Sequence, residues 1–182
     1  FLKIVFLIQL FGTNTFTDSL IVIISIYWFW SKIIIYSLFS VSLVPSLSLL
    51  RNPQEEIKLT LNTLHSVNFI SLISFFAFLL FCEPIIKLFA PIDDPLFIST
   101  AHRFFIIMSP LVFLMPITEI FTVLNQYSKR MKVASINLTV WNAIQLFSIL
   151  VVFYFFEESE YLIYFLGIGT IIGYIITSII QL

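Results

Sequence analysis

The chain has 182 residues, of which 60% are hydrophobic and only 10% are charged, and its formal net charge at pH 7 is −1. This composition excludes an ordinary soluble domain, because apolar stretches longer than the roughly 20 residues needed to cross a bilayer recur along the whole chain. No basic block of the kind that binds nucleic acid is present, and the single cysteine, Cys82, excludes an internal disulfide and a multi-cysteine metal site. The sequence therefore predicts an all-α, multi-pass integral membrane protein.

Six apolar segments, separated by short polar linkers, make up the predicted bundle. The first covers only residues 1–11, which is too short to span a bilayer, and the chain starts without methionine; we therefore expect a fragment whose first helix is truncated. In the second, Pro45 is expected to kink or end the helix, because proline lacks the N–H that continues the backbone hydrogen bonding. The six segments, which form one transmembrane domain over 1–182, are 1–11, 18–50, 59–89, 96–127, 133–156 and 161–182.

The charges of the linkers predict the orientation, because Lys and Arg are retained on the cytoplasmic side whereas acidic residues have little influence. The linkers after the second and fourth segments are basic. Those after the third and fifth are acidic, with Asp93 and Asp94 in one and EESE at 157–160 in the other, and we expect these to be solvated turns rather than metal ligands. The basic linker residues, all expected in the cytoplasm, are Arg51, Lys58, Lys129, Arg130 and Lys132.

Two charges lie inside the second segment. Asp18 and Lys32 are separated by about 21 Å on a helix that rises about 1.5 Å per residue, so they cannot neutralise each other. An unpaired charge in hydrocarbon costs at least about 2.5 kcal/mol, and each side chain therefore needs another partner or water. Residues seven apart share a helix face, and a polar stripe suited to the wall of a water-filled cavity is predicted for Asp18, Ser25, Lys32, Tyr36 and Ser40.

The fourth segment carries a carboxylate, Glu119, on its polar face. We expect Glu119 either to pair with Lys32 or to be protonated, because burial disfavours the charged form; a structural hydrogen bond is the alternative. Pro110 and Pro116 are expected to bend this segment. The fifth segment has a polar stripe, formed by Ser135, Thr139 and Asn142. The sixth has a pair of glycines that permits close packing, Gly169 and Gly173.

Each charge has a plainer explanation as well. Asp18 suits the first turn of the second helix as a cap, Lys32 can extend its long side chain to an interface, and Lys3 can be a cytoplasmic anchor. No catalytic triad, HExxH motif or nucleotide-binding loop is found, so neither an enzyme nor a cofactor or metal is predicted. Packing or interfacial positions are expected for Trp28, Trp30 and Trp141.

Several motifs occur in the order found in one transporter family. FGTNTFTD at 11–18 resembles FGAGxxTD, LVP at 43–45 is similar to FVP, and LNQYSKRMKVASINLTVWN at 124–142 resembles LNxxxRFxxPAxxPxxxN. These are motifs of the MurJ/MviN lipid II flippases, within the multidrug/oligosaccharidyl-lipid/polysaccharide exporter superfamily. The resemblance covers most of the chain and corresponds to the first six of the family's fourteen helices.

The resemblance implies the N-terminal lobe of a flippase in the bacterial cytoplasmic (inner) membrane, with a missing C-terminal lobe as the opposite wall of a central cavity. Such a protein moves a polyprenyl-pyrophosphate-linked sugar, such as the cell-wall precursor lipid II, by alternating access. The family's paired arginines fall on Ser31 and Lys32. Substrate binding is accordingly expected at Lys3, Asp18 and Lys32. From the polar faces of the second and fourth segments, the residues expected to line the cavity are Ser25, Tyr36, Ser40 and Glu119.

Other functions remain open. Because one arginine of the pair is replaced by serine, and lysine lacks the two-pronged guanidinium that binds phosphate, a flippase for lipid-linked O-antigen or exopolysaccharide is an alternative. In a non-transporting membrane scaffold subunit, the polar stripes would pack against another protein instead of lining water. A membrane-embedded glycan enzyme is the least favoured, since no convergent catalytic residues are found.

Overall fold

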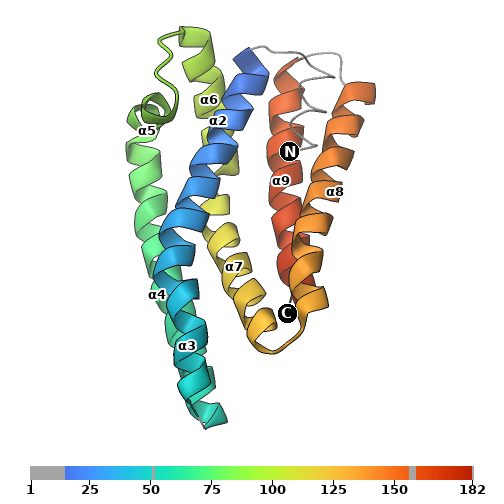
Figure 1. The fold of residues 1–182 in the computed structure, drawn as a ribbon. Helices are drawn as coiled ribbons and strands as arrows, with labels where there is room; N and C mark the ends of the chain where they lie inside the picture. Colours follow the sequence, from blue (N-terminus) through green and yellow to red (C-terminus); the bar gives the residue numbers. More distant parts are fainter. Residues whose placement is uncertain (1–14, 51, 156–158, 182) are drawn as a thin grey trace.

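The computed structural model describes residues 15–50, 52–155 and 159–181; the predicted first segment, and Lys3 with it, lies outside these ranges. The helices are α2 (Thr15–Phe29), the π-helix η1 (Trp30–Ser40), α3 (Val41–Leu49), α4 (Pro53–Leu80), α5 (Cys82–Phe89), α6 (Pro95–Met108), α7 (Leu111–Tyr127), α8 (Met131–Phe155) and α9 (Ser159–Gln181) (Figure 1). Within the described ranges four helices are long and apolar enough to cross a membrane, or five if the bent pair α6 and α7 is one span. The predicted all-α membrane class is confirmed.

Helices α2, η1 and α3 follow one another as a single apolar span, Thr15–Leu49. The span does not end at Pro45, because α3 continues past it to Leu49. A membrane helix tolerates proline where π-type winding and serine hydroxyls satisfy the freed backbone groups. In this span, the π-helix η1 lies directly before α3, and the hydroxyls of Ser42 and Ser46, near Pro45, donate to the carbonyls of Leu38 and Ser42.

The third span, α4, begins at Pro53 rather than at the predicted residue 59. Asn52 caps it by accepting a hydrogen bond from the amide of Gln54 at 3.0 Å, and proline suits the first helical position because the N–H that it lacks would be unpaired there. The helix ends at Leu80, and the rest of the predicted third segment forms the separate short helix α5.

The fourth predicted segment consists of two helices, α6 and α7, bent by 52°. At the break, the amide of Ser109 donates to the carbonyl of Ile106 at 3.2 Å instead of to that of Phe105, as a continuing α-helix would require. The hydroxyl of Tyr27 in α2 donates to the carbonyl of Phe105 at 2.7 Å. The bend expected at Pro110 is therefore confirmed, and a buried tyrosine satisfies the carbonyl that the bend leaves free.

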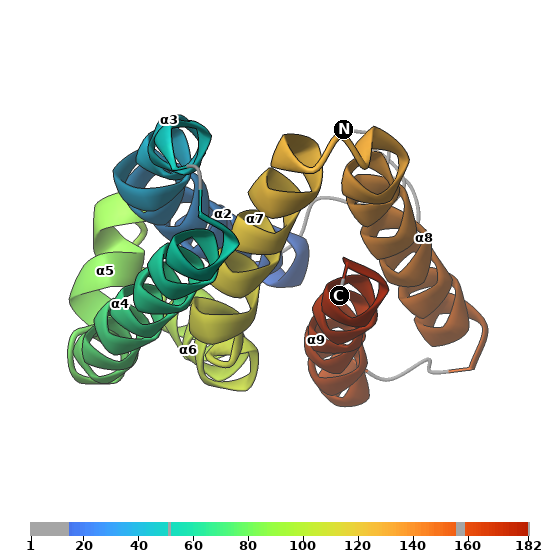
Figure 2. The same ribbon diagram turned by 90° about the horizontal axis from the view of Figure 1, so that it is seen from below.

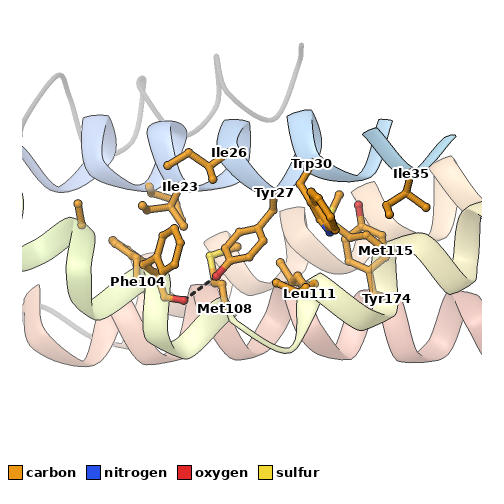
Figure 3. Packing of buried hydrophobic residues seen from close by; sticks show 14 of the residues in the cluster. Ile23, Ile26, Tyr27, Trp30, Ile35, Phe104, Met108, Leu111, Met115 and Tyr174 are labelled. Atoms are coloured by element: carbon orange, nitrogen blue, oxygen red, sulfur yellow. Dashed lines mark hydrogen bonds between the residues drawn. The ribbon is translucent and has the colours of Figure 1, made fainter. Parts of the chain in front are cut away.

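The apolar core lies between the second span and α6 with α7. Figure 3 shows the side chains of Tyr27 and Trp30 pointing from this span toward those two helices. The ring centroid of Tyr27 lies 5.4 Å from that of Phe105 and 5.9 Å from that of Phe78 in α4. This packing fixes α2 firmly against α6.

Helix α7 lies between two groups of helices. Seen from below, α3, α4 and α5 lie on one side of it, and α8 and α9 lie on the other (Figure 2). Helices α8 and α9 pack closely, since a Cβ on Gly173 would lie 3.0 Å from Trp141 and one on Gly169 would collide with the hydroxyl of Ser148. The close packing predicted at these glycines is confirmed.

The basic linker between α7 and α8 is a tight turn. The backbone amide of Lys129 donates to the carbonyl of Gln126 at 3.0 Å, and that of Arg130 donates to the backbone carbonyl of Asn125 at 2.8 Å. This is the Schellman pattern of a helix end. Lys129 has φ of 61°, the left-handed conformation in which glycine is usually found. This turn and the end of α3 lie at the same end of the bundle (Figure 1), as the alternation of linkers predicts.

Candidate functional site

A cavity of about 350 Å³ lies between the second span and the helices α7, α8 and α9. Its described wall combines one cation, one carboxylate, aliphatic hydroxyls and three aromatic rings, which is a suitable mixture for a charged, polar ligand. The lining residues are Trp28, Lys32, Glu119, Thr122, Ala134, Ser135, Trp141 and Tyr174.

An ion pair crosses the wall of this cavity. Nζ of Lys32, in η1, lies 2.6 Å from Oε1 of Glu119, in α7, so the contact is a charge-assisted hydrogen bond. The side chain of Glu119 is 9% exposed, whereas that of Lys32 is 38% exposed. Of the options left open for Glu119 by the sequence, the structure shows the pairing with Lys32. The two charges differ in their surroundings: the carboxylate is buried in the wall, and the ammonium is exposed to the cavity.

Lys32 has a second neighbour on its own helix. Its Nζ lies 5.6 Å from the ring centroid of Tyr36, within the range of a cation–π interaction. Both Lys32 and Tyr36 belong to η1, and π-helical winding is frequent at functional sites. The ammonium group therefore has a carboxylate on one side and an aromatic face nearby.

Polar contacts between α7 and α9 hold the far wall in place. The hydroxyls of Thr118 and Ser178 are 2.8 Å apart, and Nε2 of Gln181 donates to Oγ1 of Thr122 at 2.9 Å. The side-chain amide of Asn125, a residue of the LNQYSKR motif, donates to the backbone carbonyl of Gln181 at 3.0 Å. The side chains of Thr118, Thr122 and Asn125 in α7 are thus tied to the end of α9.

The cavity is closed toward the start of α2 and extends toward the turn between α7 and α8. Beside Trp28, only about 10 Å³ of space remains among the packed side chains. The rings of Trp141 and Tyr174 lie 5.3 Å apart and belong to the linings of both this small space and the cavity. At the other end, Ala134 and Ser135 line the cavity near the first turn of α8.

The structure brings together only part of the predicted stripe. Asp18 is exposed in the first turn of α2, and the exposed hydroxyl of Ser25 donates to the carbonyl of Ile21 at 2.7 Å; neither residue lines the cavity. Ser31 is fully buried and does not line it either. The side chain of Ser40, like Lys3, lies outside the described ones.

Two lining residues were assigned a different role from the sequence. Trp28 and Trp141 were expected in packing or at an interface, but both lie in the cavity wall. Trp28 is four residues before Lys32 and therefore shares its helix face, which is the signal that could have placed it there. Trp30 does pack in the core, with its ring 5.8 Å from that of Phe78.

The comparisons with known proteins identify one family. Residues 7–182, nearly the whole chain, match the family model described as "Lipid II flippase MurJ". No curated protein and no solved structure matches the chain.

Proposed function

Because the chain belongs to the lipid II flippase MurJ family, we propose that it is a flippase lobe that moves a polyprenyl-pyrophosphate-linked sugar across the bacterial cytoplasmic membrane by alternating access. No bond of the substrate is made or broken in this process. The observation that carries the proposal is the half-exposed ammonium of Lys32 in the wall of a cavity of about 350 Å³ within an otherwise apolar bundle.

Lys32 is proposed to bind the pyrophosphate. A cation in hydrocarbon is costly, and such residues mark substrate paths when they face a cavity. Lysine is a flexible point charge rather than a two-pronged donor, so one lysine holds a diphosphate incompletely. Further cations would come from Lys3 and from the opposing C-terminal lobe, which we propose as partner.

The rest of the wall suits the sugar. The rings of Trp28, Trp141 and Tyr174 offer apolar faces, and the hydroxyls of Thr122 and Ser135 can exchange hydrogen bonds with sugar hydroxyls. The polyprenyl tail would remain in the bilayer beside the bundle. A pocket with rings and few charges is better suited to a glycan headgroup than to a bare inorganic ion.

Asp18 is proposed to act at the other end of the same span. It is exposed in the first turn of α2, beyond the packed region beside Trp28, and so it is separated from the cavity. A carboxylate there would balance charge or gate when the lobe opens toward that side. It also suits the helix N-terminus, where negative charge is favourable.

The test is Lys32→Ala in the intact protein, expressed in a strain depleted of its own lipid II flippase. We expect complementation to be lost at normal abundance in the membrane, because the pyrophosphate loses its cation. Lys87→Ala is the matched control, since Lys87 is an exposed lysine of α5 that pairs with Glu83 and Asp93 and should be dispensable. Retained complementation by Lys32→Ala would refute the role of this residue.

A further inference from the structure

We infer that Glu119 is an internal competitor for the anionic group of the substrate: it holds Lys32 while the cavity is empty and must release it before a diphosphate binds. The inference rests on the proposed function, because it concerns the same cation. It assigns to Glu119 control over which anions the cavity accepts.

The first step is the charge balance of the wall. Among the described lining residues Lys32 is the only cation, and Glu119 already lies 2.6 Å from it. An incoming anion therefore meets a neutral pair rather than a free positive charge. It must replace the carboxylate at the ammonium and then remain close to it, and like charges repel strongly where little water screens them.

The second step is the asymmetry of the pair. Glu119 is almost completely buried, whereas Lys32 is exposed to the cavity on a long flexible side chain. Lys32 is thus the partner that can move, and the ring of Tyr36, whose centroid lies 5.6 Å from Nζ in the paired state, attracts the ammonium independently of Glu119. Release of the pair requires a rotamer change of one lysine and no rearrangement of the backbone.

The third step is selectivity. An anion of lower charge than a diphosphate, such as inorganic phosphate, has less advantage over Glu119, because the carboxylate is already held in position beside Lys32. A diphosphate carries more negative charge on adjacent groups and can outcompete a single carboxylate. Glu119 therefore raises the charge that a ligand needs in order to bind, and return of Lys32 to Glu119 favours departure of the substrate after the lobe reorients.

The experiment measures binding of inorganic pyrophosphate and inorganic phosphate to the intact purified protein, using the fluorescence of Trp28 and Trp141 in the cavity wall. In Glu119→Gln, we expect pyrophosphate to bind at least tenfold more tightly than in the unmodified protein, and the preference for pyrophosphate over phosphate to fall at least threefold. The double variant Lys32→Gln with Glu119→Gln should lose this gain.

The matched control is Glu83→Gln, which also removes the carboxylate of a lysine ion pair, but on the exposed surface of α5. An unchanged or lower affinity in Glu119→Gln, an equal gain in Glu83→Gln, or a gain that survives the loss of Lys32 would each overturn the inference. If Glu119→Gln does not accumulate, Glu119→Asp lengthens the contact while keeping the charge; a gain of about threefold supports competition, and no gain refutes it.

The outcome is separable from that of the proposed function. Loss of complementation in Lys32→Ala together with unchanged anion affinity in Glu119→Gln would leave the flippase role in place and remove the competition. Full complementation by Lys32→Ala together with tighter binding in Glu119→Gln would leave the competition in place and remove the role of Lys32 in transport.

Discussion

The second span is sealed along its first half and open along its second. Around α2, the ring of Tyr27 packs against those of Phe105 and Phe78, and only about 10 Å³ is left beside Trp28. Around η1, a cavity of about 350 Å³ separates the same span from α8, and an ion pair crosses its wall. The span follows α6 in the sealed half and α7 in the open half, so the 52° bend between those helices marks where packing gives way to the cavity.

The largest effect on this contrast is expected from Phe105→Ala. Phe105 is fully buried between α2, α4 and α6, and removal of such a ring leaves a void that costs about 3 to 5 kcal/mol of stability. Thermal unfolding of the purified protein measures the loss. The control is Ile106→Ala on the same helix, because Ile106 is exposed and should change stability by less than about 1 kcal/mol. Equal losses in the two variants would mean that the sealed half is not the stable one.

A smaller effect is expected from Tyr27→Phe, which keeps the ring and removes only the hydroxyl. The buried carbonyl of Phe105 then lacks the hydroxyl that donates to it, at a cost of about 1 to 3 kcal/mol. Unfolding measurements on this variant and on Tyr164→Phe, where the tyrosine is half-exposed, separate the lost bond from a general effect of the substitution. A Tyr27→Phe protein as stable as the original would contradict the role of this bond at the bend.

The smallest expected effect on stability comes from a labelling experiment that compares two cysteines. Cys82 is buried in α5, where desolvation and the neighbouring Glu83 raise its thiol pKa to about 11. We expect a maleimide applied to membranes at pH 7 to spare Cys82 and to label Ser135→Cys in the cavity wall, because the thiolate is the reactive form and water reaches only the second site. Labelling of Cys82 as fast as of Ser135→Cys would contradict the difference in water access between the packed region and the cavity.

The raised pKa of Cys82 also determines how the stability of the protein changes with pH. The folded protein favours the neutral thiol of Cys82, so its contribution to stability is complete below the ordinary pKa of 9.0 and is lost as pH rises toward about 11. Labelling of Cys82 should accelerate across this interval. The alkylation rate of the unmodified protein, followed from pH 8 to pH 11, checks this expectation.

Some features could be predicted from the sequence, because they follow from the free-energy cost of placing particular residues in a membrane helix. A charge in hydrocarbon needs a partner, and that argument included the pair of Lys32 and Glu119 among its options although the two residues are far apart in the chain. Proline and glycine predicted the bend at Pro110 and the close packing at Gly173. Of the two proposed substrate-binding residues that the structure describes, Asp18 and Lys32, it is Lys32 that lies in the cavity wall.

Other features depend on tertiary packing and could not be read from spacing. The predicted stripe counted residues seven apart as neighbours along an open groove, whereas tight packing at the level of Trp28 ends the cavity before Ser25 and Asp18. The hydrogen bond from Tyr27 to Phe105 joins two residues with no shared pattern. The start of α4 was predictable, because Asn52 followed by Pro53 is a capping signal that the hydropathy of the segment obscured.

The winding of η1 has a mechanical consequence for the span. Over its 11 residues the turns are wider and shorter than those of the α-helices on either side, so the span holds surplus chain at the level of Lys32. Tightening those turns would lengthen the segment and rotate α3 relative to α2, which Tyr27 anchors to α6. A change in the winding of η1 would therefore turn Lys32, the cation of the cavity, relative to the anchored helix α2.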